Sequence, residues 1–245
     1  MPALLRGPDQ KKAGLVQPSH NSVLDDLGRR IAGGEIPSGT VLTLAGLEAD
    51  YQVSRTVIRE AVRVLESKHM VESKRRVGVT VTPMSRWSAL DSALICWRLD
   101  SPARPQQLVA LTELRVAVEP AAARLTALRA SEEDRTEMGR LAHVLQTLGD
   151  AGKGDTEEYL AADIAFHNLL LDTCGNLMLA ALKEPVAEMI SGRHNAGLTP
   201  GDPVEESLHN HVEAATAIVR GDADAAEKYV RAYCDSILNE VRTLG

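Results

Sequence analysis

The sequence is poor in aromatic residues, in cysteine and in long apolar runs. Seven of its 245 residues are aromatic, and the second half is rich in alanine and leucine, which favours helices over sheets. The three cysteines are widely spaced and form no Cys-x-x-Cys pair, as expected of reduced thiols. No run of 18 apolar residues predicts a membrane span, and residues 1–12 lack the apolar core of a secretion signal. We therefore expect a cytoplasmic, mainly helical protein.

Charge is distributed unevenly along the chain. The formal net charge is −7, but residues 1–83 carry 12 Lys and Arg against 9 Asp and Glu, a net of +3. The remaining residues carry 15 basic and 25 acidic side chains, a net of −10. This asymmetry predicts a small basic module joined to an acidic partner domain.

The segment Val53-Ser-Arg-Thr-Val-Ile-Arg-Glu-Ala-Val-Arg-Val-Leu65 predicts a helix with two unlike sides. At about 100° per residue, one sector of about 100° carries Arg55, Thr56, Arg59 and Arg63, and apolar side chains lie opposite. Ser54 stands at the N-cap position. Such a helix can offer guanidinium groups and a hydroxyl to phosphates and base edges. Taken alone, the pattern fits an ordinary amphipathic helix with a solvated basic side equally well.

The flanking patterns favour nucleic-acid binding. We predict helices over residues 22–32, 44–51 and 54–68, and short strands at 40–42, 71–73 and 78–81. The last two strands enclose a basic turn; this hairpin carries Lys74, Arg75, Arg76 and Gly78. Three helices followed by a basic hairpin are typical of the winged helix-turn-helix, whose hairpin tip can lie in or against a minor groove.

Three pieces of this region together resemble the GntR family of bacterial transcription regulators. They are Ile36-Pro-Ser-Gly-Thr-Val-Leu, Val53-Ser-Arg-Thr-Val-Ile-Arg-Glu-Ala and Gly78-Val-Thr-Val, and their mutual spacing matches as well. The resemblance implies that operator DNA is contacted by Ser54, Arg55, Thr56 and Arg59, and that Gly78 shapes the wing. Family members often carry an arginine on the second helix where this chain has Ala45, which puts the commonest operator sequence in doubt.

The rest of the chain predicts a second, all-helical domain. Trp87, Leu90, Leu94 and Trp97 recur at spacings of three, four and three, which predicts a linker helix that packs the two domains together. Further helices are predicted at about 106–129, 132–149, 155–173, 176–192, 204–219 and 222–243. The expected organisation is a flexible arm at 1–21, a winged helix-turn-helix domain at 22–83, a linker helix at 84–105 and an all-α effector-binding domain at 106–245.

Polar residues on apolar helix faces mark a candidate site in the second domain. Asp163 and His167 are one helical turn apart, and His211 falls on the buried side of another helix. An unpaired buried carboxylate is costly, and a cation among the three side chains would remove that cost. The ligand types suit zinc first, and also nickel or manganese. The alternative is a hydrogen-bonded core cluster in which Asp163 orients His167 and Tyr233 caps the network.

This region resembles the effector-binding domain of the FadR-type subgroup of the same family. The resemblance rests on Ala162-Asp-Ile-Ala-Phe-His-Asn-Leu-Leu with Gly175-Asn176, and on His211 ten residues before Gly221-Asp222. It implies an Asp and three His that bind a metal, and three of these positions are matched by Asp163, His167 and His211. Tyr233 stands at the fourth, and tyrosine is a poor ligand unless it is ionised.

Arg115 borders an apolar stripe, with Glu119 one turn further on. One interpretation is an ion pair at the edge of the core; the other is a fork for a ligand carboxylate, with the metal holding the same acid. Arg193 and Tyr233 are further candidates for the effector pocket. Leu114-Arg-Val-Ala-Val-Glu-Pro120 resembles the subgroup's pattern, and Trp87-Ser-Ala-Leu-Asp91 resembles members that respond to sugar acids such as galactonate or gluconate.

We therefore predict a homodimeric repressor whose affinity for operator double-stranded DNA is controlled by a small carboxylate such as a sugar acid. The alternative is a metal-dependent enzyme acting on a small hydroxy acid, with the Asp163, His167 and His211 cluster activating water. That alternative leaves the basic hairpin without a purpose. A purely structural interaction module would leave both polar clusters unexplained.

Overall fold

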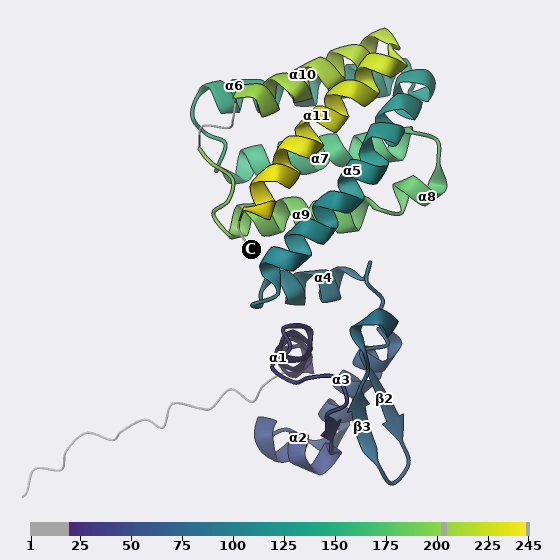
Figure 1. The fold of residues 1–245 in the computed structure, drawn as a ribbon, viewed down its shortest axis with the longest axis vertical. Helices are drawn as coiled ribbons and strands as arrows, with labels where there is room; N and C mark the ends of the chain where they lie inside the picture. Colours follow the sequence, from purple (N-terminus) through teal and green to yellow (C-terminus); the bar gives the residue numbers. More distant parts are fainter. Residues whose placement is uncertain (1–19, 202–204, 244–245) are drawn as a thin grey trace, which may run out of the picture.

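The computed structural model describes residues 20–201 and 205–243, so nearly all of the predicted arm at 1–21 lies outside the described residues. Figure 1 shows a small unit with a β-hairpin, a larger bundle of helices, and α4 between them. The structure confirms the predicted fold class: a mainly helical chain with an N-terminal winged helix-turn-helix. Among the described helices, none is both long and apolar enough to cross a bilayer.

The small unit consists of three helices and a three-stranded antiparallel sheet. Its elements are α1 (His20–Ala32), β1 (Val41–Leu42), α2 (Leu44–Tyr51), α3 (Arg55–Ser67), β2 (Val71–Lys74) and β3 (Gly78–Val81), and the strand order is β1-β3-β2. The two longer helices, α1 and α3, pack in one core through Leu27, Ile31, Ile58 and Leu65. The predicted helices and strands of this region are thus confirmed to within two residues.

Gly78 is required by the pairing of β1 with β3. Its φ is +123°, a conformation that L side chains rarely adopt. A Cβ atom at this position would lie 2.6 Å from the carbonyl oxygen of Leu42 on the neighbouring strand. The glycine therefore allows β1 to close the sheet beside the hairpin.

The predicted linker helix over 84–105 is wrong in its extent. A short 3₁₀ turn spans Met84–Arg86, and α4 runs only from Ser92 to Leu99. The side chain of Asp91 accepts a hydrogen bond from Leu94 N, which fixes the start of the helix there. Leu90 stays 53% exposed, so the apolar spacing before Asp91 does not reflect one continuous helix.

Helix α4 nevertheless packs the two units together, as predicted for the linker. It contributes side chains to the core of the small unit and to the core of the bundle. Leu94 and Trp97 belong to the core of the small unit, whereas Ile95 and Leu99 belong to the core of the bundle. The indole N–H of Trp97 also donates to Asp25 of α1, at 3.2 Å.

The bundle is built from α5 (Arg104–Arg129), α6 (Glu132–Asp150), α7 (Glu157–Thr173), α8 (Leu177–Ala180), α9 (Lys183–Asn195), α10 (Glu205–Arg220) and α11 (Ala223–Arg242). In Figure 1, α5 and α11 run side by side across the bundle, and α9 lies nearest to α4. Asp222 caps α11 as predicted, accepting a hydrogen bond from Ala225 N.

The single helix predicted at 176–192 is wrong, because the structure has α8 and then α9 in its place. Pro185 supplies the physical reason. A proline has no N–H to donate and its ring collides with the carbonyl four residues earlier, so it fits best in the first turn of a helix, as Pro185 does in α9, although Pro120 is accommodated inside α5. The chain therefore begins a new helix at Lys183.

Candidate functional site

Helix α3 presents its polar side to solvent. The exposed side chains are Arg55, Thr56, Arg59 and Arg63, while Ile58, Ala61, Val62 and Leu65 are buried on the opposite side. Ser54 precedes the helix in an extended conformation, and its hydroxyl makes no capping hydrogen bond with the described residues. The structure therefore confirms the predicted polar and apolar sides of α3, except that Val57 is only half-buried.

The basic side chains of this surface differ in how firmly they are held. Arg63 is bound to Glu60 at 2.6 Å, and Nε of Arg55 lies 3.7 Å from Glu48. Within the described part of the chain, Arg59, Arg75 and Arg76 take part in no ion pair. These three guanidinium groups are therefore available to an external anion.

The hairpin carries its basic residues at its tip. Lys74 pairs with Glu72 at 2.8 Å, while Arg75 and Arg76 are exposed in the turn that follows. Val77 N donates to Lys74 O at 3.1 Å, which closes the turn. In Figure 1 the tip between β2 and β3 points away from the bundle. The arginines thus extend from the same small unit that presents α3.

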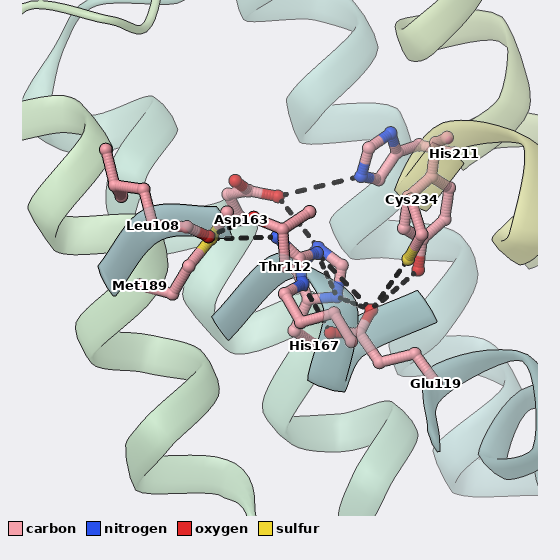
Figure 2. Close-up of polar contacts among 10 residues, drawn as sticks. Leu108, Thr112, Glu119, Asp163, His167, Met189, His211 and Cys234 are labelled. Atoms are coloured by element: carbon pink, nitrogen blue, oxygen red, sulfur yellow. Dashed lines mark hydrogen bonds and ion pairs between the residues drawn. The ribbon is translucent and has the colours of Figure 1, made fainter. Parts of the chain in front are cut away.

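In the bundle, α7 brings Asp163 and His167 together, as predicted. Nε2 of His167 lies 3.3 Å from Oδ1 of Asp163, and Nδ1 lies 2.9 Å from Glu119. Burial by itself would lower the pKa of His167, but the charge of Glu119 and the hydrogen bonds to both carboxylates raise it. Figure 2 shows the Asp163 carboxylate in contact with both His167 and His211, with Glu119 on the other side of His167.

His211, on α10, completes the cluster. Its Nδ1 donates to the carbonyl oxygen of Ser207 at 2.8 Å, so Nε2 carries the lone pair. Nε2 is buried, has no hydrogen-bond partner among the described residues, and lies 3.7 Å from Oδ1 of Asp163. Burial lowers the pKa of His211 to about 4, so the ring is neutral at pH 7. A buried lone pair beside a carboxylate is what a cation would satisfy.

These three residues can hold a divalent metal ion. Their donor atoms all lie within 4.8 Å of one another. Donors bound to one tetrahedral zinc at about 2.1 Å are separated by about 3.4 Å, so small side-chain rotations would bring them onto one ion. Burial alone would raise the pKa of Asp163, but the hydrogen bond from His167 and the nearby positive charges lower it to about 2, which keeps this ligand ionised.

Arg115 and Glu119 are not at the edge of the core, as one interpretation predicted, but deep inside it. Their side chains are 2% and 0% exposed and are joined by a 2.6 Å ion pair. Nη2 of Arg115 also lies 3.0 Å from Nε2 of His167. The carboxylate of Glu119 supports His167 from behind, because it contacts Nδ1, the ring nitrogen that does not face Asp163. A carboxylate behind a histidine ligand orients the ring and selects its tautomer.

Tyr233 belongs to the same buried layer. Its ring stacks on that of His211, with centroids 4.1 Å apart and planes 10° apart. Its hydroxyl donates to Glu119 at 3.2 Å. Burial raises the pKa of Tyr233 far above its ordinary value, so the phenol stays neutral. The structure thus places this hydroxyl on Glu119, behind His167.

A cavity of about 340 Å³ opens in front of the cluster. Asp163 and His211 line it, whereas Arg115, Glu119 and Tyr233 do not. Of the four residues predicted to contact an effector, Arg193 alone lines this cavity. It comes from α9, is 12% exposed, and its Nη2 lies 2.7 Å from Glu240 of α11.

Most of the cavity wall consists of residues that were not predicted from the sequence. The missed side chains include Tyr159, Thr199, Ser207, Ser236 and Glu240. Two of them could have been found from helical spacing, because Tyr159 is four residues before Asp163 and Ser207 is four before His211. The two residues of each pair lie on the same face of one helix, so a polar residue that lines the cavity predicts that the residue four positions earlier lines it as well.

Comparison with known proteins adds the family context. Residues 20–81 match the model for bacterial regulatory proteins of the gntR family, and residues 110–236 match the FCD domain. The galactonate operon transcriptional repressor of Escherichia coli (strain K12) is 32% identical over 208 residues, covering 82% of this chain and 87% of that protein. The Uxu operon transcriptional regulator of the same organism is 28% identical over 187 residues, covering 71% and 67%.

A solved structure shares the whole fold. It is that of Lar, which controls the expression of the Listeria monocytogenes agr system, and it superposes with a TM-score of 0.63. The match covers 96% of this chain and 100% of that one, at 16% identity. A likeness at this identity concerns the fold alone.

Proposed function

Since this chain belongs to the GntR family of bacterial regulatory proteins and carries an FCD domain, we propose that it is a repressor released from its operator by a small sugar-acid carboxylate. The family makes it a DNA-binding transcriptional regulator, and the relatives described above are regulators, not enzymes. Repression and the sugar-acid effector are suggested by the relative named for the galactonate operon. We expect the protein to act in the cytoplasm.

The observation that carries the effector proposal is the unpartnered Nε2 of His211, buried beside Asp163 in the wall of the cavity. Three protein donors would leave a bound divalent ion with an open coordination position for the carboxylate and hydroxyl oxygens of a ligand. Zinc is the first candidate, with nickel and manganese next. Arg193, which also lines the cavity, would bind a second region of the same ligand.

The DNA contacts follow from the exposed basic surface. We assign the major groove to α3, whose contact residues are Ser54, Arg55, Thr56, Arg59 and Arg63. We assign the wing to the minor groove or its phosphates, through Lys74, Arg75 and Arg76, while Gly78 keeps the hairpin against β1. Two such units in a homodimer would bind a pseudo-palindromic operator.

Control of the DNA by the acid requires that the ligand bind two arrangements of the protein with different affinity. Contacts between helices connect the cavity to the DNA-binding unit. Arg193 of the cavity wall lies on α9, next to Gly192, whose position against Leu99 joins α9 to α4. Helix α4 in turn packs on α1 of the DNA-binding unit through Trp97.

Thermal unfolding in the presence of Zn²⁺ and galactonate tests the proposed cavity. At a ligand concentration about 100 times Kd, binding should stabilise the fold by about 2.7 kcal/mol and raise Tm by about 5 °C or more. A chelator should abolish this rise. His211→Ala should abolish it too and should leave operator binding without effector intact, whereas His209→Ala, on the exposed side of the same helix, should behave like the unsubstituted protein.

A rise in Tm that persists with chelator, or an equal response of His211→Ala, would refute the metal-assisted site. Operator release by galactonate in a gel-shift assay provides the functional readout. If the acid binds but strengthens the operator complex, the protein is not a repressor relieved by this ligand.

A further inference from the structure

We infer that Glu240 makes the cavity selective for singly charged polyhydroxy acids and against dicarboxylates. This inference rests on the proposed function, because it concerns the ligand of the same cavity. It adds a residue that determines specificity and a chemical class of ligand that the cavity excludes.

The first observation is the position of Glu240. Both of its carboxylate oxygens lie within hydrogen-bond distance of Nη2 of Arg193, at 2.7 and 2.8 Å. Glu240 and Arg193 both line the cavity, and Figure 1 shows the C-terminal end of α11 beside α9. The guanidinium that would hold an effector carboxylate is therefore already paired with a protein carboxylate.

The second observation is the balance of charge around the cavity. Among the lining residues that the structure describes, Asp163 and Glu240 each contribute one negative charge and Arg193 one positive charge. His211 adds no charge, because a histidine binds a metal ion as the neutral ring. Adding one divalent ion leaves a single positive charge to be neutralised. One carboxylate balances it, whereas two carboxylates leave an uncompensated negative charge in a partly buried site.

The third observation is the hydrogen-bonding character of the wall. Glu240 can accept hydrogen bonds from hydroxyl groups, and the serine hydroxyls at positions 207 and 236 can both donate and accept. A polyhydroxy chain therefore finds hydrogen-bonding partners in this wall, with Glu240 among them. A second carboxylate near Glu240 would face a like charge and could not donate a hydrogen bond to it.

Calorimetric titration of the Zn²⁺-loaded full-length protein with galactonate and with galactarate tests the inference. These acids share their four secondary hydroxyls and differ at one end, where galactonate has a primary alcohol and galactarate a second carboxylate. The unsubstituted protein should bind galactonate more tightly. Glu240→Gln keeps a side chain that can hydrogen-bond Arg193 but removes the charge, and it should shift the ratio of the two affinities toward galactarate by about tenfold or more.

Asp235→Asn is the matched control, because it removes one charge from the exposed side of the same helix, outside the cavity. Its affinity ratio should equal that of the unsubstituted protein. An unchanged ratio in Glu240→Gln, or preference of the unsubstituted protein for galactarate, overturns the inference. Failure of the proposed function is a different result: no acid binds any of the three proteins in a metal-dependent way, and the inference falls with it.

Discussion

At the residue scale, the exposed arginines of α3 differ in whether they must break an intramolecular ion pair to bind DNA. Arg63 would have to leave Glu60, and Arg55 lies close to Glu48, whereas Arg59 has no ion-pair partner in the described part of the chain. A guanidinium without an intramolecular partner loses no ion pair when it meets a phosphate or a guanine edge. Arg59 should therefore contribute most to operator affinity.

Replacing Arg59 by alanine should weaken operator binding by at least about tenfold, as expected for the loss of 1–3 kcal/mol in a base or phosphate contact. Fluorescence anisotropy with a labelled operator at fixed salt measures the change. Arg140→Ala, which removes an exposed guanidinium from α6, is the control. Unchanged operator affinity in Arg59→Ala, with Tm unaltered, would contradict the assignment of α3 as the recognition helix.

Cys96 lies where α4 packs on α9, and its thiol should be unreactive. Burial raises the pKa of this thiol to about 12, helped by the hydrogen bond to Glu188 at 2.9 Å. The thiolate is the reactive form, so alkylation by iodoacetamide at pH 8 should be far slower than that of free cysteine. Glu188→Gln should lower the pKa and speed alkylation at Cys96, read by peptide mass analysis. Equal rates in both proteins would show that Glu188 does not control the thiol.

At the scale of elements, glycines let α4 approach its two neighbours closely. A Cβ atom on Gly28 of α1 would lie 2.7 Å from the ring of Trp97, and one on Gly192 of α9 would lie 2.6 Å from Leu99. Trp97 is 4% exposed and bound to Asp25, so its ring has little room to shift. These two close contacts fix the position of α4 between the DNA-binding unit and the bundle.

Gly28→Ala should therefore destabilise the protein by about 1–3 kcal/mol, because overpacking more than cancels the higher helix propensity of alanine. Gly139→Ala is the matched substitution, since its Cβ would meet only Val219 Cγ2 at 3.8 Å. It should stabilise α6 by up to about 1 kcal/mol. Urea unfolding of both variants measures the difference. If Gly28→Ala were as stable as the unsubstituted protein, or more stable, the close packing of α4 on α1 would be disproved.

At the scale of the whole molecule, the division of charge governs how the protein meets DNA. The first 83 residues carry a net of +3 and the remainder a net of −10. The acidic bundle repels DNA, so attraction is confined to the surface that carries α3 and the hairpin. Binding should depend on counterion release and fall steeply with salt.

The dependence of log K on log salt concentration should flatten when a wing arginine is lost. Arg75→Ala and Arg76→Ala should each reduce the magnitude of the slope by about one, since each removes one phosphate contact. Operator binding measured between about 50 and 200 mM salt checks this. An unchanged slope in both variants would mean that the hairpin tip does not touch the DNA backbone.

Local patterns predicted most of this molecule. The basic side of α3 and the pair Asp163 and His167 depend on helical periodicity, which neighbouring residues determine among themselves. The same rule identified Arg115 and Glu119 as a pair but placed it at the edge of the core. Spacing shows which side chains meet on one helix; it does not show that α7 and α11 cover both of them.

The sequence by itself determined where helices carry apolar and polar faces, where the charge lies, and which family pattern the chain follows, because these properties belong to residues a few positions apart. Only the tertiary structure decided that Glu119 stands behind His167, that the hydroxyl of Tyr233 bonds to Glu119, and that Arg193 meets Glu240 at the cavity. The reason is physical: burial, ion pairing and access to a cavity depend on which helices pack together, and residues distant in the chain make those contacts.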